Sequence, residues 1–100
     1  MSKWKDCTSY ASGQRGAIAP STWELAAGML RIVVVRNHIN NPDQWCMHCH
    51  MLRMDTVQLN IPSTASAVTA QAAALRLVRE RICQLLISID KALQKDASHE

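Results

Sequence analysis

The middle of the chain alternates between apolar and polar residues in the manner of a β-hairpin. Residues 29–39 contain a β-branched run from Ile32 to Val35, and such residues lose side-chain freedom in a helix but pack well in a sheet. Residues 44–51 alternate strictly, which is the period of a half-buried strand. Between these two segments, the Asn-Asn-Pro-Asp sequence of residues 40–43 favours a turn. The pattern therefore predicts two antiparallel strands over residues 29–39 and 44–52.

This hairpin has one apolar face. A turn at residues 40–43 places Val34 opposite Cys49 and Ile32 opposite Met51. The two strands then agree on which side is apolar, and that agreement is stronger evidence than either pattern alone. The apolar face carries Leu30, Ile32, Val34, Trp45, Met47, Cys49 and Met51, and the other face carries Val33, Val35, Asn37, Cys46, His48 and His50.

Short apolar segments on either side extend the hairpin into a small antiparallel meander. Residues 23–25 predict a strand before it, although a helix over residues 22–39 is an alternative that Gly28 and the β-branched run disfavour. Residues 56–59 predict a strand after it.

The C-terminal third has the spacing of an amphipathic helix over about residues 64–93. Ser63 or Thr64 is suited to cap it, and apolar residues then recur at every third or fourth position. A helix of roughly 28 residues is about 42 Å long, whereas a ten-residue strand is about 34 Å long. Either the N-terminal segment folds back over the part of the helix that extends beyond the strands, or a second copy of the chain packs on it. The second alternative predicts a homodimer through this helix.

Composition fits one small folded domain. The chain has 100 residues, of which 48% are hydrophobic, and this is enough apolar surface for one core but not for two. Residues 1–20 show no sustained period and predict a flexible arm, pinned by Trp4 or Tyr10, before a single α+β domain over residues 21–100. The sequence shows neither a secretory signal nor a membrane span, so we expect a cytoplasmic protein with reduced thiols.

The net charge of the chain does not by itself identify a partner. The formal net charge is +3, which is well short of a dedicated nucleic-acid-binding protein, so a nucleic-acid partner is not expected. Among the basic residues only Arg76, Arg79 and Arg81 cluster, on the polar side of the predicted helix. They predict either an electrostatic contact with an acidic protein or phosphate, or simply a solvated face.

Residues 46–50 match the C-x-x-C-H pattern of covalent haem, and with Trp45 they also resemble the active-site segment of thioredoxin-like oxidoreductases. Both chemistries need the motif at a helical turn or a helix N-terminus. On a strand, Cys46 and Cys49 point to opposite faces, so they can neither form a disulfide nor share one zinc ion.

The same strand predicts another candidate, because Cys46, His48 and His50 share one face at alternate positions. Successive members are about 7 Å apart, and a His-x-His pair on a strand can bind one zinc ion with both imidazoles. The alternative is that these are polar residues on a solvated face. Asn37, His38 or Cys7 would complete the metal site.

The sequence shows no paired carboxylates, nucleophile elbow or glycine-rich phosphate loop, and it has only three Gly. We therefore expect no enzymatic activity, and a protein-interaction module that docks through its hairpin face or its helix. A metal-binding or thiol-redox module is the alternative. The expected interaction residues are Arg36, His48, His50, Arg76, Arg79 and Arg81.

The order of these elements resembles small proteins encoded by phages and prophages. The resemblance is carried by the Leu-Arg-Ile-Val-Val segment from Leu30, by Pro42 and Trp45, and by the Ala-rich segment 70–81 that ends in Val-Arg-Glu-Arg. Some proteins of this meander-plus-helix kind are similar to anti-CRISPR proteins. The resemblance implies an inhibitor that blocks a surface of a host complex such as a CRISPR effector.

Overall fold

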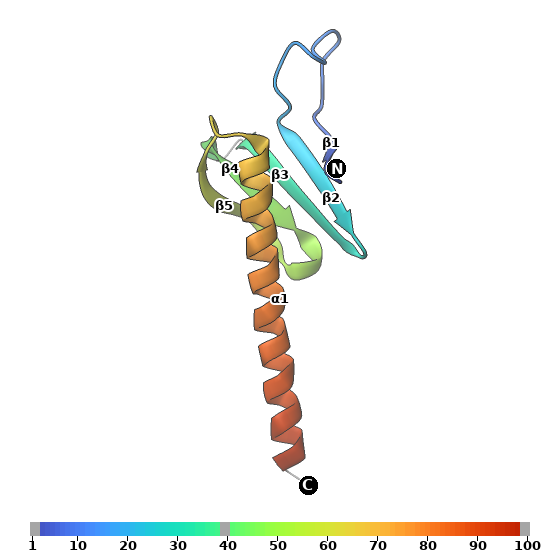
Figure 1. Ribbon diagram of the computed structural model, residues 1–100, viewed down its shortest axis with the longest axis vertical. Helices are drawn as coiled ribbons and strands as arrows, with labels where there is room; N and C mark the ends of the chain where they lie inside the picture. The colour runs from blue at the N-terminus through green and yellow to red at the C-terminus, as the bar shows by residue number, and fades with distance from the viewer. Residues whose placement is uncertain (1–2, 39–40, 99–100) are drawn as a thin grey trace.

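The chain folds into a five-stranded antiparallel sheet and one long helix, which confirms the predicted α+β meander (Figure 1). The computed structural model describes residues 3–38 and 41–98. Each strand pairs with its neighbour in the sequence, in the order β1-β2-β3-β4-β5. The elements are β1 (Lys5–Asp6), β2 (Thr22–Ala27), β3 (Leu30–His38), β4 (Asn41–Cys49), the 3-10 turn η1 (His50–Leu52), β5 (Met54–Pro62) and α1 (Ala67–Ser98).

The central hairpin, β3 and β4, keeps its predicted faces but not its predicted register. Val34 pairs with Met47 instead of Cys49. The strand β4 already begins at Asn41, so residues 41–43 are not a turn as predicted, and residues 39–40 lie outside the described part of the chain. Because side chains alternate with a period of two, a shift of two residues leaves the described side chains up to Cys49 on their predicted faces.

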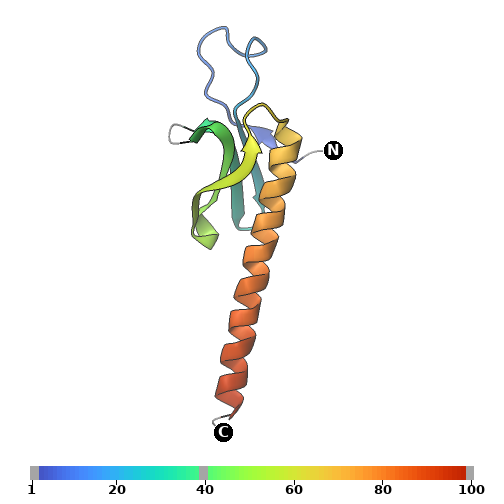
Figure 2. The ribbon, with the colours of Figure 1, turned by 90° about the vertical axis from the view of Figure 1, so that its left-hand side faces the viewer.

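The core lies between one face of the sheet and the first half of α1 (Figure 2). Ala70 and Ala74 are fully buried, and their small side chains let the helix approach the strands closely. The indole of Trp45 is also fully buried, and its Nε1–H donates a hydrogen bond of 3.1 Å to the carbonyl oxygen of Ala65. The buried cluster contains Ile32, Val34, Trp45, Met47, Cys49, Leu59, Ala70, Ala74 and Val78.

The second strand of the hairpin ends earlier than the sequence predicts. β4 stops at Cys49, and the chain turns through η1 to Arg53, which has a positive φ of 56°. Met51 is therefore 57% exposed, and its predicted place on the apolar face is wrong. Strict alternation continues in the sequence past the point where the strand ends.

The strands predicted on either side of the hairpin are present and longer than expected. The strand β2 replaces the alternative helix over residues 22–39. The strand β5 covers Met54–Pro62 and contains Thr56 and Asn60 at positive φ, with register shifts against β4. Such irregularities twist an edge strand and disfavour pairing with another chain.

The long helix begins later than predicted. Residues 63–65 form a turn, in which the amide of Ala65 donates to the carbonyl oxygen of Pro62. The cap is Ser66, whose Oγ accepts a hydrogen bond of 3.4 Å from the amide of Thr69, so neither Ser63 nor Thr64 has this role. α1 has 32 residues, which corresponds to about 48 Å.

Part of the predicted N-terminal arm belongs to the sheet. β1 pairs with β2 and places Lys5 beside Glu24. The buried hydroxyl of Thr8 accepts hydrogen bonds from the amides of Ser21 (2.9 Å) and Thr22 (3.1 Å). The arm therefore contributes an edge strand and a loop fixed at both ends.

Candidate functional site

The first candidate surface is the half of α1 that extends beyond the sheet (Figure 1). Every residue from Cys83 to Lys95 is exposed. Three of them are large apolar residues on one side of the helix: Leu86 (54% exposed), Ile89 (55%) and Leu93 (62%). This half of the helix therefore has an apolar side that is exposed to solvent.

These residues belong to a stripe that runs along the whole helix. Its positions are separated alternately by four and three residues, and we call it the helix stripe. Val68 is 72% exposed and Leu75 is 39% exposed, so these positions are uncovered even beside the sheet, whereas Ile82 is half-buried and packs against the core. The helix stripe consists of Val68, Ala72, Leu75, Arg79, Ile82, Leu86, Ile89 and Leu93.

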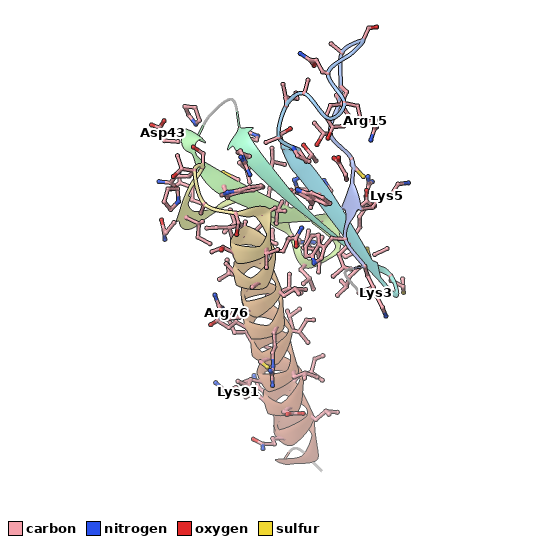
Figure 3. The ribbon with its side chains drawn as sticks, turned by 45° about the horizontal axis from the view of Figure 1, so that its top comes forward. Lys3, Lys5, Arg15, Asp43, Arg76 and Lys91 are labelled. Atoms are coloured by element: carbon pink, nitrogen blue, oxygen red, sulfur yellow. The ribbon has the colours of Figure 1, made fainter. Side chains whose placement is uncertain are left out.

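One charged residue, Arg79, lies within the helix stripe, and another, Asp90, lies beside it. Arg79 and Asp90 are both exposed, and their separation corresponds to about three helical turns, so they share one side of α1. Arg76 and Lys91 project from the helix, whereas Lys3, Lys5 and Arg15 lie near β1 (Figure 3).

The predicted arginine cluster is thus divided. Arg76 and Arg79 are exposed, but Arg81 is half-buried, and its Nε–H donates a hydrogen bond of 3.3 Å to the carbonyl oxygen of Leu52. Arg36 is half-buried too, with its guanidinium 4.6 Å from the centre of the Trp45 ring. Arg81 and Arg36 therefore pack against the fold, and only Arg76 and Arg79 are free to meet a partner.

The second candidate surface is a pocket of about 350 Å³ that is lined from the sheet face opposite the core. It gathers side chains from β2, β3 and β4, from the segment after β1 and from η1. Val33, which is buried, contributes an apolar wall. The lining residues are Cys7, Thr22, Glu24, Arg31, Val33, His48, His50 and Met51.

An ion pair neutralises one side of this pocket. Arg31 donates to Glu24 through Nε (2.7 Å) and through Nη2 (2.9 Å), and these bonds hold the pKa of Glu24 below its usual value. The thiol of Cys7 donates to the same carboxylate at 3.4 Å. Desolvation and then this hydrogen bond raise the pKa of Cys7, so its thiol stays protonated.

The other side of the pocket holds two histidines whose ring centres are 5.3 Å apart. The Nδ1 atom of His50 lies 3.1 Å from Oδ1 of Asp55. Burial, followed by the charges of His50 and Arg31, lowers the pKa of His48, which favours its neutral imidazole. A neutral imidazole keeps one nitrogen lone pair with which it can bind a metal ion.

The structure brings together only part of the predicted metal site. His48, His50 and Cys7 line the pocket, but Cys46 does not, because it is buried between Val35 and Gln58 in the sheet. In residues 3–38 and 41–98, no three side chains of His, Cys, Asp or Glu are placed to hold one ion. His38 does not line the pocket, and the side chain of Asn37 lies outside the described part.

The C-x-x-C-H segment does not have the geometry of haem attachment or of a thioredoxin active site. It lies on β4 up to Cys49, where Cys46 and Cys49 are buried on opposite faces as free thiols. This confirms the predicted division of the two sulfur atoms between the faces.

Sequence reasoning missed Glu24, Arg31 and Asp55. Glu24 pairs with Val33, so Arg31 is its diagonal neighbour across the hairpin, a position within reach of long side chains. That signal is readable once the register of β2 and β3 is known. Asp55 reaches His50 only because η1 turns the chain.

Comparison with known protein families, with curated proteins and with solved structures finds no match to this chain. Within the described residues, no helix is both long and apolar enough to cross a membrane.

Proposed function

We propose that the chain is a non-enzymatic protein-interaction module whose docking surface is the helix stripe. The observation that supports this is the exposure of Leu86, Ile89 and Leu93 on the half of the helix in which every residue from Cys83 to Lys95 is exposed. Contiguous exposed apolar side chains on a small protein mark interaction surfaces.

The occupant we propose is a second copy of the chain. Alternating spacings of four and three residues are the repeat of a coiled coil, in which one apolar stripe packs into another. The chain itself carries such a stripe, and a two-fold contact between two copies uses the same surface twice.

Charge favours an antiparallel pair. In a parallel pair, Arg79 would face the same arginine of the partner, and two like charges would lie together in the interface. Antiparallel helices that cross near residue 84 instead place Arg79 beside the partner's Asp90. The same crossing sets Ile82 against the partner's Leu86.

We expect a weak dimer. Burying the exposed half of a Leu or Ile side chain stabilises the complex by about 1 kcal/mol. Association itself costs about 4 to 15 kcal/mol. The three side chains Leu86, Ile89 and Leu93 of two copies together contribute about 6 kcal/mol, which offsets only the lower end of that cost, so we expect dimers at high protein concentration.

Sedimentation equilibrium over a range of protein concentrations tests this proposal. The wild-type chain should dimerise, and the Leu86→Gln/Ile89→Gln variant should remain a monomer with unchanged helix content. Ile87→Gln is the matched control, because Ile87 is as exposed but lies off the stripe. A wild-type monomer at every concentration, or equal losses in variant and control, contradicts the proposal.

Reversing single charges tests the antiparallel arrangement. Arg79→Asp should weaken the dimer by placing two carboxylates together, and the double variant Arg79→Asp/Asp90→Arg should restore it. If the double variant is as weak as the single one, the helices do not cross in this way.

A host complex as a further partner, implied by the resemblance to phage and prophage proteins, stays a prediction. Adding the purified chain to a purified CRISPR effector tests it, with DNA cleavage as the readout. Unchanged cleavage would contradict that version of the function.

A further inference from the structure

The pocket opposite the core has the chemistry of a site for a soft metal ion. We propose that it binds one Cu(I) ion through the imidazoles of His48 and His50 and the thioether of Met51. This inference is independent of the proposed dimer, since it uses the sheet and η1 rather than the helix stripe.

The separation of the two imidazoles fits a shared ion. A metal–nitrogen bond of about 2 Å places an ion roughly 3 Å from the ring centre, so two rings that share an ion have centres about 5 to 6 Å apart. The observed distance between the ring centres of His48 and His50 is 5.3 Å.

Asp55 gives one ring the orientation that a metal ligand needs. Histidines that bind metals commonly donate the other ring N–H to a carboxylate, which fixes the ring and its tautomer. His50 has this arrangement, with Nδ1 3.1 Å from Oδ1 of Asp55. Its Nε2 then carries the lone pair.

The third ligand selects the metal. Zinc prefers nitrogen, thiolate or carboxylate ligands, and no group of three such side chains is assembled among the described residues. Met51, however, lines the same pocket as the two histidines. Thioethers bind soft ions, and Cu(I) in particular.

The rest of the pocket is compatible with a singly charged ion. The carboxylate of Glu24 forms an ion pair with Arg31, so the charges of these two groups nearly cancel. The thiol of Cys7 donates a hydrogen bond to the same carboxylate, and the proposed site does not use Cys7 as a ligand. The apolar wall at Val33 favours a weakly hydrated ion.

Anaerobic titration of the full chain with Cu(I), in competition with a chromophoric Cu(I) chelator, tests the proposal. Cys7 and Cys83 are exposed thiols that also bind copper, so the titration uses the Cys7→Ser/Cys83→Ser chain. We expect one Cu(I) per chain, with nitrogen and sulfur neighbours in X-ray absorption.

Substitutions of the ligands identify the site. Met51→Leu should weaken Cu(I) binding by about tenfold or more and remove the sulfur signal, whereas Met29→Leu, at an exposed methionine outside the pocket, should change neither. His50→Gln should abolish stoichiometric binding, and its exposed side chain makes loss of the fold a poor explanation. Equal affinity in Met51→Leu and the wild type, or an equal loss in Met29→Leu, overturns the proposal.

Discussion

Ala74 and Ala92 lie about five turns apart on the same face of α1, yet Ala74 is fully buried and Ala92 is exposed. The docked half of the helix, up to Ile82, packs against the sheet. In the projecting half, every residue from Cys83 to Lys95 is exposed. One amphipathic helix therefore has two environments, and the sequence period alone does not distinguish them.

The first turns of the docked half differ from the projecting half in side-chain size. Ala70 and Ala74 face the sheet in the docked half, and small residues let a helix backbone come close to strands. Leu86, Ile89 and Leu93 occupy the projecting half, and large aliphatic side chains suit packing between two helices, whose axes lie about 8 to 10 Å apart. The difference supports a helical partner for the projecting half.

The largest expected effect comes from breaking the junction between the sheet and the docked half. Trp45→Ala removes a fully buried ring and its hydrogen bond to Ala65, and should lower the free energy of unfolding by about 3 to 5 kcal/mol. Trp45→Phe keeps an aromatic ring and should cost less. Urea denaturation measures the free energy of unfolding of both variants. If Trp45→Ala lost less stability than Trp45→Phe, this junction would not be what holds the helix on the sheet.

A matched pair of substitutions then measures the contrast within the helix. Ala74→Leu forces a large side chain into the contact with the sheet and should cost about 1 to 3 kcal/mol. Ala92→Leu adds the same atoms at an exposed position and should change the free energy of unfolding by less than about 0.5 kcal/mol. Urea denaturation at low protein concentration compares them, and equal effects would contradict the division of α1 into two halves.

The sequence predicts the faces of the central strands better than their register. Alternation assigned the faces of β3 and β4 correctly, because it reports only which side is buried. It could not assign the register, because shifting one strand by two residues leaves every face unchanged. The end of β4 was missed for a related reason: the apolar side chain of Met51 continues the pattern into η1, where it is exposed.

The candidate sites were predictable to a smaller extent. The sequence identified His48 and His50 and the excess length of the helix. It placed Cys46 with the two histidines because alternate positions share a face, but alternation does not show that Cys46 is buried between Val35 and Gln58. The pocket also depends on Glu24 and Asp55, whose contacts arise from the register of β2 and from the turn at η1, and neither can be read from local pattern.

The smallest expected effect is on the pH dependence of stability, and it is measured by comparing a carboxylate at the sheet edge with one on the projecting half. Asp6 accepts hydrogen bonds from the amide of Thr8 (3.0 Å) and the hydroxyl of Tyr10 (2.5 Å), and the bonds from Thr8 and then Tyr10 lower its pKa. A carboxyl whose pKa is lower in the folded state stabilises the fold above its unfolded pKa, and this contribution is lost as the pH falls through the folded value. The wild-type chain should therefore lose stability below about pH 4 more steeply than Asp6→Asn.

Thermal unfolding across the acidic range measures this difference, and Asp90→Asn is the matched control. Asp90 is exposed on the projecting half, so its substitution should leave the pH dependence of a dilute, monomeric sample unchanged. Parallel pH profiles for Asp6→Asn and the wild type would mean that the hydrogen bonds of Thr8 and Tyr10 do not fix the N-terminal strand. A change in Asp90→Asn as large as that in Asp6→Asn would instead mean that the projecting half is coupled to the fold, because a helix segment without contacts transmits no such effect.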